Sequence, residues 1–270
     1  MLYRGAKSPV VRDMGGFKVR LNMPGWLLPW PRDHGYGPLA MVAETILDPG
    51  RLVAMHEHRN DEILSWVPEG VMRHDDRATG RLVTDRAHLM VMNAGQSFWH
   101  SEETLSGDPP LRMLQILVRP HSVDLPPNIQ YGPIEPAPLN CWRHLVGAEG
   151  EGAPFYFRNA IDFFDLRLEA TAKVAFPRKE GRHLYFYVFS GSVEVGGVRF
   201  DEGDQGLHQS DGPLDLVGIG NALIVAFLID PRAPAARKGT VGDHPKIPSP
   251  VLARTLLTLL RLRDRLRRRS

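Results

Sequence analysis

Residues 192–200 read Ser-Val-Glu-Val-Gly-Gly-Val-Arg-Phe, and this stretch indicates the kind of fold that the chain adopts. Apolar residues alternate with polar ones on both sides of a Gly-Gly pair, which is typical of two strands joined by a two-residue turn. Short runs of branched and aromatic residues suit strands buried on both faces, and they recur at 63–67, 113–118, 184–189 and 223–228. Residues 165–169 alternate as a half-buried strand should. Many short strands predict an all-β sandwich or barrel.

The composition agrees with a globular β protein. The chain has 270 residues, of which 43% are hydrophobic and 24% charged. Its 26 glycines and 23 prolines favour turns over long helices. The single cysteine, Cys141, excludes a disulfide within the chain and a cysteine-based zinc site. We expect a reducing, cytoplasmic setting, because neither an apolar signal segment nor a run long enough to span a bilayer is evident.

Positive charge is concentrated at the C-terminal end. The net charge is +2, yet residues 251–270 hold seven arginines against one acid, Asp264, so the rest of the chain is mildly acidic. A mildly acidic body argues against nucleic-acid binding there. The basic tail could contact an anionic surface or a partner, or its leucines could simply dock a helix on the body.

A weak internal repeat indicates two similar β modules. The step of five residues from Gly95 to His100 recurs from Gly203 to His208. Six prolines between residues 120 and 138 mark a connection. We therefore expect an N-terminal metal-binding barrel, a connecting segment, a second barrel and a short basic helical tail, at 1–125, 126–140, 141–240 and 241–270.

Two pairs of residues have the spacing of metal ligands. His56 and His58 share one face of a strand, and imidazole suits zinc, iron, copper and nickel. His100 and Glu102 repeat this spacing on a second predicted strand. If the two strands lie side by side, three nitrogens and one carboxylate converge and leave coordination positions open for chemistry. The plainer explanation is two surface histidines and a glutamate that caps a turn.

Two weaker candidates lie nearby. Glu62 follows His58 by four residues and could replace Glu102 as the anionic ligand. The segment His74-Asp75-Asp76 could bind a cation, although a solvated turn before Gly80 explains it more simply.

The pattern of these residues resembles the pirin family of bicupins. The similarity is dense from about Gly35 to Val118 and looser over the second half. It rests on His56-Glu-His-Arg-Asn-Asp-Glu-Ile63, Glu69-Gly70, His74 with Asp76, and Ala94-Gly95 before His100-Ser-Glu102.

The resemblance implies two antiparallel jelly-roll barrels in tandem and one divalent metal, usually iron, in the N-terminal barrel. The implied metal ligands are His56, His58, His100 and Glu102. Met90, Met92, Phe98 and Trp99 could line a pocket, of which alternation allows about half to face the metal, or they could be ordinary barrel core.

The sequence departs from the family pattern in the surroundings of the site. Glu57 replaces a proline and should point away from the metal, Arg86-Ala87-His88 replaces a Pro-Gly-Asp turn, and Asp76-Arg77 replaces an Asp-Ser pair.

The second barrel is expected to lack a metal site. Aligning Gly191 with Gly70 puts Pro177 and Lys179 at the positions of His56 and His58. Matching the step from Gly203 to that from Gly95 puts His208 and Ser210 at the positions of His100 and Glu102.

Family members are linked to the dioxygenation of flavonols such as quercetin, and others to metal-dependent regulation of partner proteins. We therefore expect an Fe²⁺-dependent dioxygenase that combines dioxygen with a flavonol-, enol- or catechol-like aromatic small molecule. Glu102 would then also serve as the catalytic base. The alternative is a non-enzymatic metal-dependent sensor that binds a protein partner. A metal-dependent isomerase of small hydroxy-carbonyl compounds is a third class.

Overall fold

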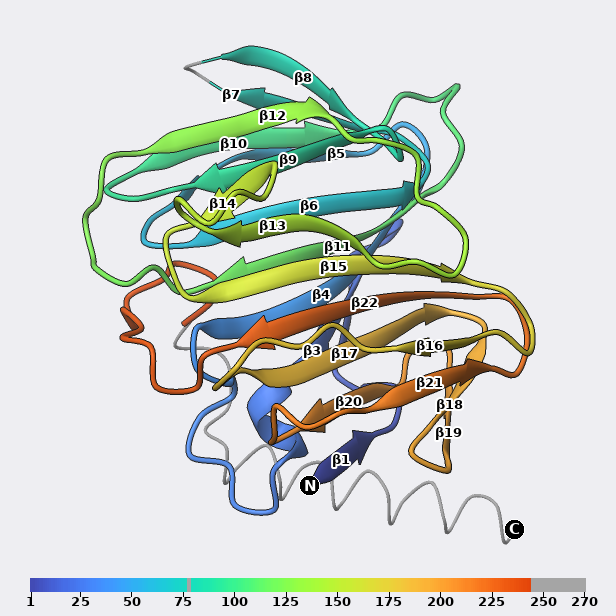
Figure 1. The fold of residues 1–270 in the computed structure, drawn as a ribbon. Helices are drawn as coiled ribbons and strands as arrows, with labels where there is room; N and C mark the ends of the chain where they lie inside the picture. The colour runs from blue at the N-terminus through green and yellow to red at the C-terminus, as the bar shows by residue number, and fades with distance from the viewer. Residues whose placement is uncertain (77–78, 244–270) are drawn as a thin grey trace, which may run out of the picture.

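The computed structural model describes residues 1–76 and 79–243, and it consists almost wholly of β-strands (Figure 1). The strands form two seven-stranded and two four-stranded sheets. A single 3₁₀ turn, η1 (Pro24–Leu27), interrupts the strands of this described part. No helix in it is both long and apolar enough to cross a membrane. The predicted all-β class is confirmed. Of the helical tail expected at 241–270, residues 241–243 form a turn, and the rest lies outside the described residues.

The N-terminal barrel pairs a large sheet with a small one. The large sheet has the order β12-β9-β6-β11-β4-β3-β2 and the small sheet has the order β5-β10-β7-β8. One core joins both sheets, since Phe98 and Met72 of the small sheet pack with Ile63 and Met90 of the large one. The strands are β2 (Val11–Asp13), β3 (Phe17–Asn22), β4 (Leu39–Leu47), β5 (Leu52–His58), β6 (Glu62–Glu69), β7 (Met72–Asp76), β8 (Gly80–Thr84), β9 (His88–Asn93), β10 (Phe98–Glu103), β11 (Leu111–Val118) and β12 (Asn128–Pro133).

The C-terminal barrel repeats this arrangement. Its sheets have the orders β1-β20-β17-β22-β15-β13-β14 and β16-β21-β18-β19. The strands are β1 (Leu2–Gly5), β13 (Arg143–Ala148), β14 (Phe155–Phe157), β15 (Ile161–Leu168), β16 (Lys173–Ala175), β17 (His183–Ser190), β18 (Ser192–Val195), β19 (Val198–Asp201), β20 (Gln205–His208), β21 (Asp215–Gly218) and β22 (Ala222–Ile229). The predicted hairpin is β18–β19, in which Val195 pairs with Val198 and both turn glycines have positive φ.

Strand order shows that one sequence alignment was wrong. β20-β17-β22-β15 corresponds to β9-β6-β11-β4, so β20 is the counterpart of β9 and β21 that of β10. His208 ends β20 and is therefore not the counterpart of His100 on β10. The equal glycine-to-histidine steps misled because Gly95 precedes β10, whereas Gly203 precedes β20.

Two strands lie outside the modules to which their sequence positions assigned them. The segment 126–140, expected to connect the barrels, contains β12, whose Ile129 pairs with Met92 of the N-terminal sheet. β1 joins the sheet of the other barrel, where Tyr3 pairs with Leu207. Each barrel is thus extended at an edge by a strand from outside its expected range.

The two large sheets pack face to face and bury the strands between them. On β6, Ile63 faces the core of its own barrel, while Leu64 faces a second core shared with the other barrel. Phe163 and Phe227 fill that shared core from the C-terminal side. This double burial explains the uninterrupted apolar runs in the sequence. It also accounts for Asp165, which is buried rather than solvated and accepts a hydrogen bond from Trp66 at 2.9 Å.

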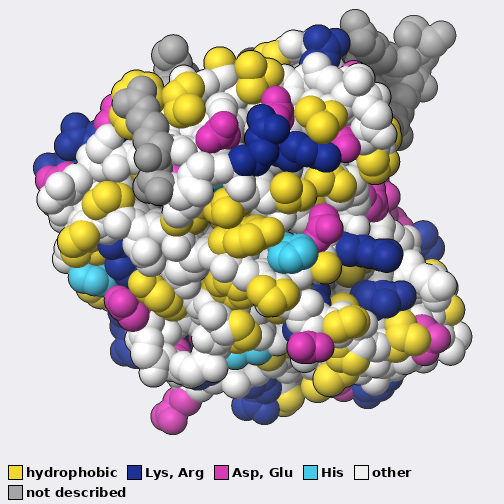
Figure 2. Space-filling view, turned by 90° about the horizontal axis from the view of Figure 1, so that it is seen from above, with side chains coloured by type: hydrophobic (Ala, Val, Ile, Leu, Met, Phe, Trp, Pro, Cys, Tyr) yellow, Lys and Arg dark blue, Asp and Glu magenta, His cyan; other side chains and the backbone are white. Residues whose placement is uncertain are grey.

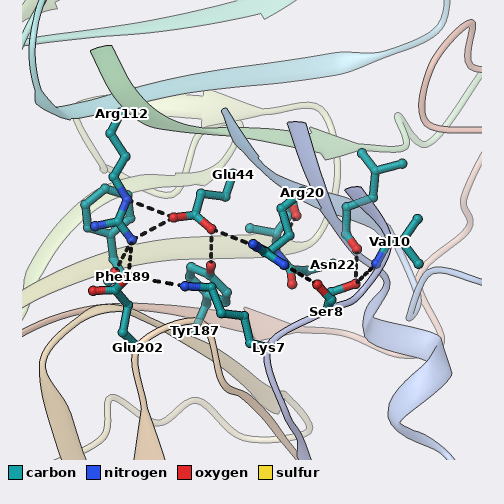
Figure 3. Close-up of polar contacts among 12 residues, drawn as sticks. Lys7, Ser8, Val10, Arg20, Asn22, Glu44, Arg112, Tyr187, Phe189 and Glu202 are labelled. Carbon is teal, nitrogen blue, oxygen red and sulfur yellow. Dashed lines mark hydrogen bonds and ion pairs between the residues drawn. The ribbon is translucent and has the colours of Figure 1, made fainter. Parts of the chain in front are cut away.

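A buried polar network crosses the interface between the two barrels (Figure 3). Glu44 of β4 accepts hydrogen bonds from Arg112 at 2.8 Å and from Tyr187 of the opposite barrel at 2.9 Å. The Arg112 guanidinium also donates to the Phe189 carbonyl at 2.7 Å and lies over the Phe189 ring. Arg20 approaches Glu44 to 3.4 Å. The charge of Glu44 is therefore satisfied by groups from both barrels.

The outer surface is mixed in character. The face shown in Figure 2 interleaves apolar, basic and acidic side chains, and no single kind covers it.

Tyr187→Phe should lower the free energy of unfolding by about 2 kcal/mol, because it removes a buried hydrogen bond to a charged carboxylate. Tyr185→Phe is the matched control. Its hydroxyl donates to the neutral Gln205 within one barrel, so its loss should cost about 1 kcal/mol. Urea denaturation of both variants measures the difference. Equal losses of unfolding free energy would contradict a charged Glu44 at the interface between the barrels.

Candidate metal centre

Antiparallel pairing of β5 with β10 brings three histidines together. His56 lies directly opposite His100, and His58 lies opposite Phe98. The ring of His100 lies 4.4 Å from that of His56 and 5.0 Å from that of His58, centre to centre. One ring nitrogen from each of the three lies within 4.8 Å of the others. This spacing allows one ion to contact all three rings.

Hydrogen bonds at Nδ1 set the tautomers of the two β5 histidines. His56 Nδ1 donates to the Ala54 carbonyl at 2.9 Å. His58 Nδ1 lies 3.2 Å from the Asp61 carboxylate, which can only accept. In this tautomer of each ring, Nε2 carries the lone pair that a metal needs.

The tautomer of His100 is set by a chain of hydrogen bonds through two residues on β7. His74 Nε2 donates to Asp76 at 2.8 Å, so His74 Nδ1 carries a lone pair. That nitrogen lies 3.2 Å from His100 Nδ1, which must therefore be the donor. His100 Nε2 is left as an acceptor, like its counterparts on β5.

Burial makes these acceptors suitable for a cation. Within the described part of the chain, His58 Nε2 and His100 Nε2 are buried and have no hydrogen-bond partner. Burial, together with the nearby histidines, lowers the pKa of His100, and burial is also the main cause that lowers the pKa of His56 and His74. The rings of His56, His74 and His100 therefore favour the neutral form, and a divalent metal would satisfy the buried Nε2 atoms of His58 and His100.

Glu102 lies beside the histidines but outside their cluster of donor atoms. Its Oε1 is 4.0 Å from His100 Nδ1 and accepts a hydrogen bond from Gln115 at 3.1 Å. Burial raises the pKa of Glu102 to about 7, against the opposing effects of His58 and Gln115. A carboxyl with such a pKa can take up or release a proton near neutral pH.

The weaker candidates have other roles. Glu62 is fully buried and forms an ion pair at 3.0 Å with Arg158 of the second barrel, so its carboxylate already has a partner at the interface between the barrels. The interpretation of His74-Asp75-Asp76 as a solvated turn was wrong, because His74 and Asp76 are buried and support His100. Sequence reasoning noticed these two residues but missed their role, since the β7–β10 pairing that aligns them is not local.

The expected lining residues divide by strand alternation. Met90, Met92 and Phe98 lie in the core of the N-terminal barrel, whereas Trp99 is 37% exposed on the opposite face of β10. Glu57 binds Ser97 rather than pointing to the histidines.

A groove of about 920 Å³ lies between the barrels, away from the histidines. Its walls include Trp66, Arg86, Arg143 and Arg167, and none of the three clustered histidines lines it. Of the three clustered histidines, His56 is partly exposed and its two partners are buried.

Comparison with known proteins places both halves of the chain. The family model described as "Pirin" matches residues 33–118, which contain the three histidines. The model described as "Quercetinase C-terminal cupin domain" matches residues 145–227. The quercetin 2,3-dioxygenase of Escherichia coli K12 is 26% identical over 190 residues, which is 67% of this chain and 81% of that protein.

Solved structures share the fold. A bacterial pirin from Escherichia coli in complex with nickel(II) aligns with a TM-score of 0.73 at 16% identity, over 87% of this chain and 100% of that one. A quercetin 2,3-dioxygenase from Acinetobacter baumannii aligns with a TM-score of 0.69 at 18% identity, over 86% of each chain. The tandem barrels are thus those of a bicupin.

Asp76→Asn should weaken Ni²⁺ binding about tenfold, because the relay through His74 no longer fixes the tautomer of His100. Calorimetric titration with Ni²⁺ measures the change. Asp75→Asn, on the opposite face of β7, is the control and should bind as the wild type does. Equal affinity in the two variants would rule out the relay.

Glu102→Gln should stabilise the metal-free protein increasingly as the pH rises. The pKa of Glu102 is raised to about 7 from 4.5, so the stability of the neutral form is complete below pH 4.5 and is lost as the pH rises through 7. The variant avoids this loss, which reaches about 3 kcal/mol at pH 8.

Urea denaturation of the metal-free protein at pH 5 and pH 8 tests this, with Glu103→Gln on the other face of β10 as the control. A difference from the wild type that does not grow with pH would show that Glu102 is already ionised in the folded state.

Proposed function

The chain belongs to the pirin family of bicupins, and on that premise we propose that its three histidines hold Fe²⁺ and that the protein oxidises a flavonol-like substrate with dioxygen. The observation that carries the proposal is that one ring nitrogen from each of the three histidines lies within 4.8 Å of the others, while His58 Nε2 and His100 Nε2 are buried without a partner among the described residues. Three neutral imidazoles suit a divalent transition metal. A bacterial pirin of the same fold was crystallised in complex with nickel(II), which supports a metal in this barrel.

Glu102 is proposed as the fourth ligand and as the base. Its carboxyl is buried beside His58 and His100, where a bound cation would favour the ionised form. Gln115 holds Oε1 in place, so we assign contact with the ion and with the substrate hydroxyl to Oε2. The catalytic step for this residue is acceptance of the hydroxyl proton of a flavonol or related enol.

The other residues of the centre orient and exclude water. A bound metal would supply Lewis acidity and would orient the substrate and dioxygen relative to each other. Ala54, Asp61 and His74 hold the three ligand rings, so that little reorganisation accompanies binding. The apolar side chains of Phe98, Met90 and Met92 fill the core between the small and large sheets, which disfavours bulk water inside the barrel. An aromatic substrate would approach from the partly exposed side of His56.

His56→Ala should abolish stoichiometric metal binding and, with it, the loss of quercetin absorbance in air. His208→Ala is the control because His208 lies on β20 of the other barrel, and both its metal content and its activity should match those of the wild type. Elemental analysis and visible absorbance of Fe²⁺-loaded proteins make the two measurements.

Two outcomes separate the alternatives. Equal metal loss in both variants would place the ion elsewhere and overturn the site. Full metal binding without quercetin turnover, with iron, nickel, cobalt or manganese, would overturn the enzymatic proposal and favour a metal-dependent regulatory protein.

A further inference from the structure

We propose that residues 239–243, here called the C-terminal clamp, are part of the metal centre because they hold the carboxylate that orients His58. This inference rests on the proposed function, since it requires that His58 bind a metal. The clamp follows the second barrel in sequence, after β22, and the chain returns there to the N-terminal barrel (Figure 1).

Asp61 is shared between the ligand and the clamp. Its Oδ2 accepts hydrogen bonds from His58 Nδ1 at 3.2 Å and from the Val241 backbone N–H at 2.9 Å. Its Oδ1 accepts one from the Gly242 backbone N–H at 3.1 Å. Asp61 is 2% exposed, so these donors replace the water that would otherwise solvate its charge. The position of the carboxylate therefore depends on the clamp.

The clamp is itself anchored at both ends. Thr240 and Arg59 exchange hydrogen bonds, with Thr240 N–H donating to the Arg59 carbonyl at 3.0 Å and Arg59 N–H donating to Thr240 Oγ1 at 2.6 Å. Asp243 accepts two bonds from Arg119, at 2.8 and 2.9 Å. Arg119 is 1% exposed and also pairs with Asp33 at 2.7 Å. The clamp is thus a fixed element rather than a loose end.

Two glycines allow the close approach. A Cβ on Gly239 would lie 2.1 Å from Asp61 Oδ1, which is far inside contact distance. A Cβ on Gly242 would lie 3.0 Å from the same oxygen. Neither glycine has a positive φ, so the requirement is for space rather than for an unusual backbone conformation. Any side chain at Gly239 must displace the carboxylate or the clamp.

Displacement of Asp61 would act on the metal through His58. A carboxylate that accepts the Nδ1 proton keeps Nε2 as the lone-pair nitrogen and raises the basicity of the ring. Asp61 is a positioning residue, and the clamp positions Asp61 in turn. The metal affinity of the N-terminal barrel is therefore linked to a segment that follows the other barrel in the chain.

A graded series of glycine variants in the full chain tests the clamp. Ni²⁺ affinity is measured by calorimetry on proteins that are shown to be folded by a cooperative thermal unfolding transition. Gly239→Ala should weaken binding by tenfold or more and Gly242→Ala by about threefold, following the two contact distances. Gly107→Ala is the matched control, because an added Cβ there meets nothing within 4 Å, and it should not change the affinity.

A second readout excludes a merely structural effect. In the metal-free protein, side-chain ¹⁵N NMR should show His58 protonated at Nδ1 in the wild type and a mixture of tautomers in Gly239→Ala. If Gly239→Ala does not fold, Gly242→Ala carries both measurements. A wild type that binds Ni²⁺ together with variants of equal affinity overturns the clamp and leaves the proposed function standing. A wild type that does not bind Ni²⁺ overturns the metal centre itself.

Discussion

The pairing of β5 with β10 is the constraint on which the candidate centre depends. Because side chains alternate along a strand, His56 and His58 project to one face, and the antiparallel register sets His100 across from His56 on that face. A shift of one residue in this register would turn His100 outward and leave Trp99 in its place. The core between the two sheets of the N-terminal barrel supports that register, since Phe98 of β10 and Val53 of β5 pack into it.

The histidines are prepared for a cation by their hydrogen-bonded partners. Ala54, Asp61 and His74 each lie within hydrogen-bond distance of one Nδ1, and one ring nitrogen from each histidine lies close enough to the others to contact a single ion. These supports come from three places, namely β5, the turn after it and β7. The centre is therefore built by the barrel as a whole, and loss of any one support is expected to weaken metal binding without unfolding the protein.

The second barrel contributes to the first through polar groups as well as through packing. Arg158 satisfies the buried Glu62, Tyr187 satisfies Glu44, and the chain that follows β22 reaches Asp61. Within the described residues, the cluster of metal-binding side chains lies in the N-terminal barrel. The N-terminal barrel thus carries the candidate metal centre, and the C-terminal barrel buries the outer face of the N-terminal barrel's large sheet.

The amino-acid order by itself determined the all-β class, the glycine hairpin and the shared face of His56 and His58, because these follow from a repeat of two residues along one strand. The fully buried runs at 63–67 and 184–189 could likewise be identified, since strands covered on both sides need apolar residues throughout. Only the tertiary structure decided that Glu62 faces Arg158, that His74 supports His100 and that Asp61 is held by residue 241. It also corrected the alignment of His208, which equal spacing had placed on the wrong strand. Such contacts join residues that are distant in sequence, and no local periodicity encodes which strands become neighbours.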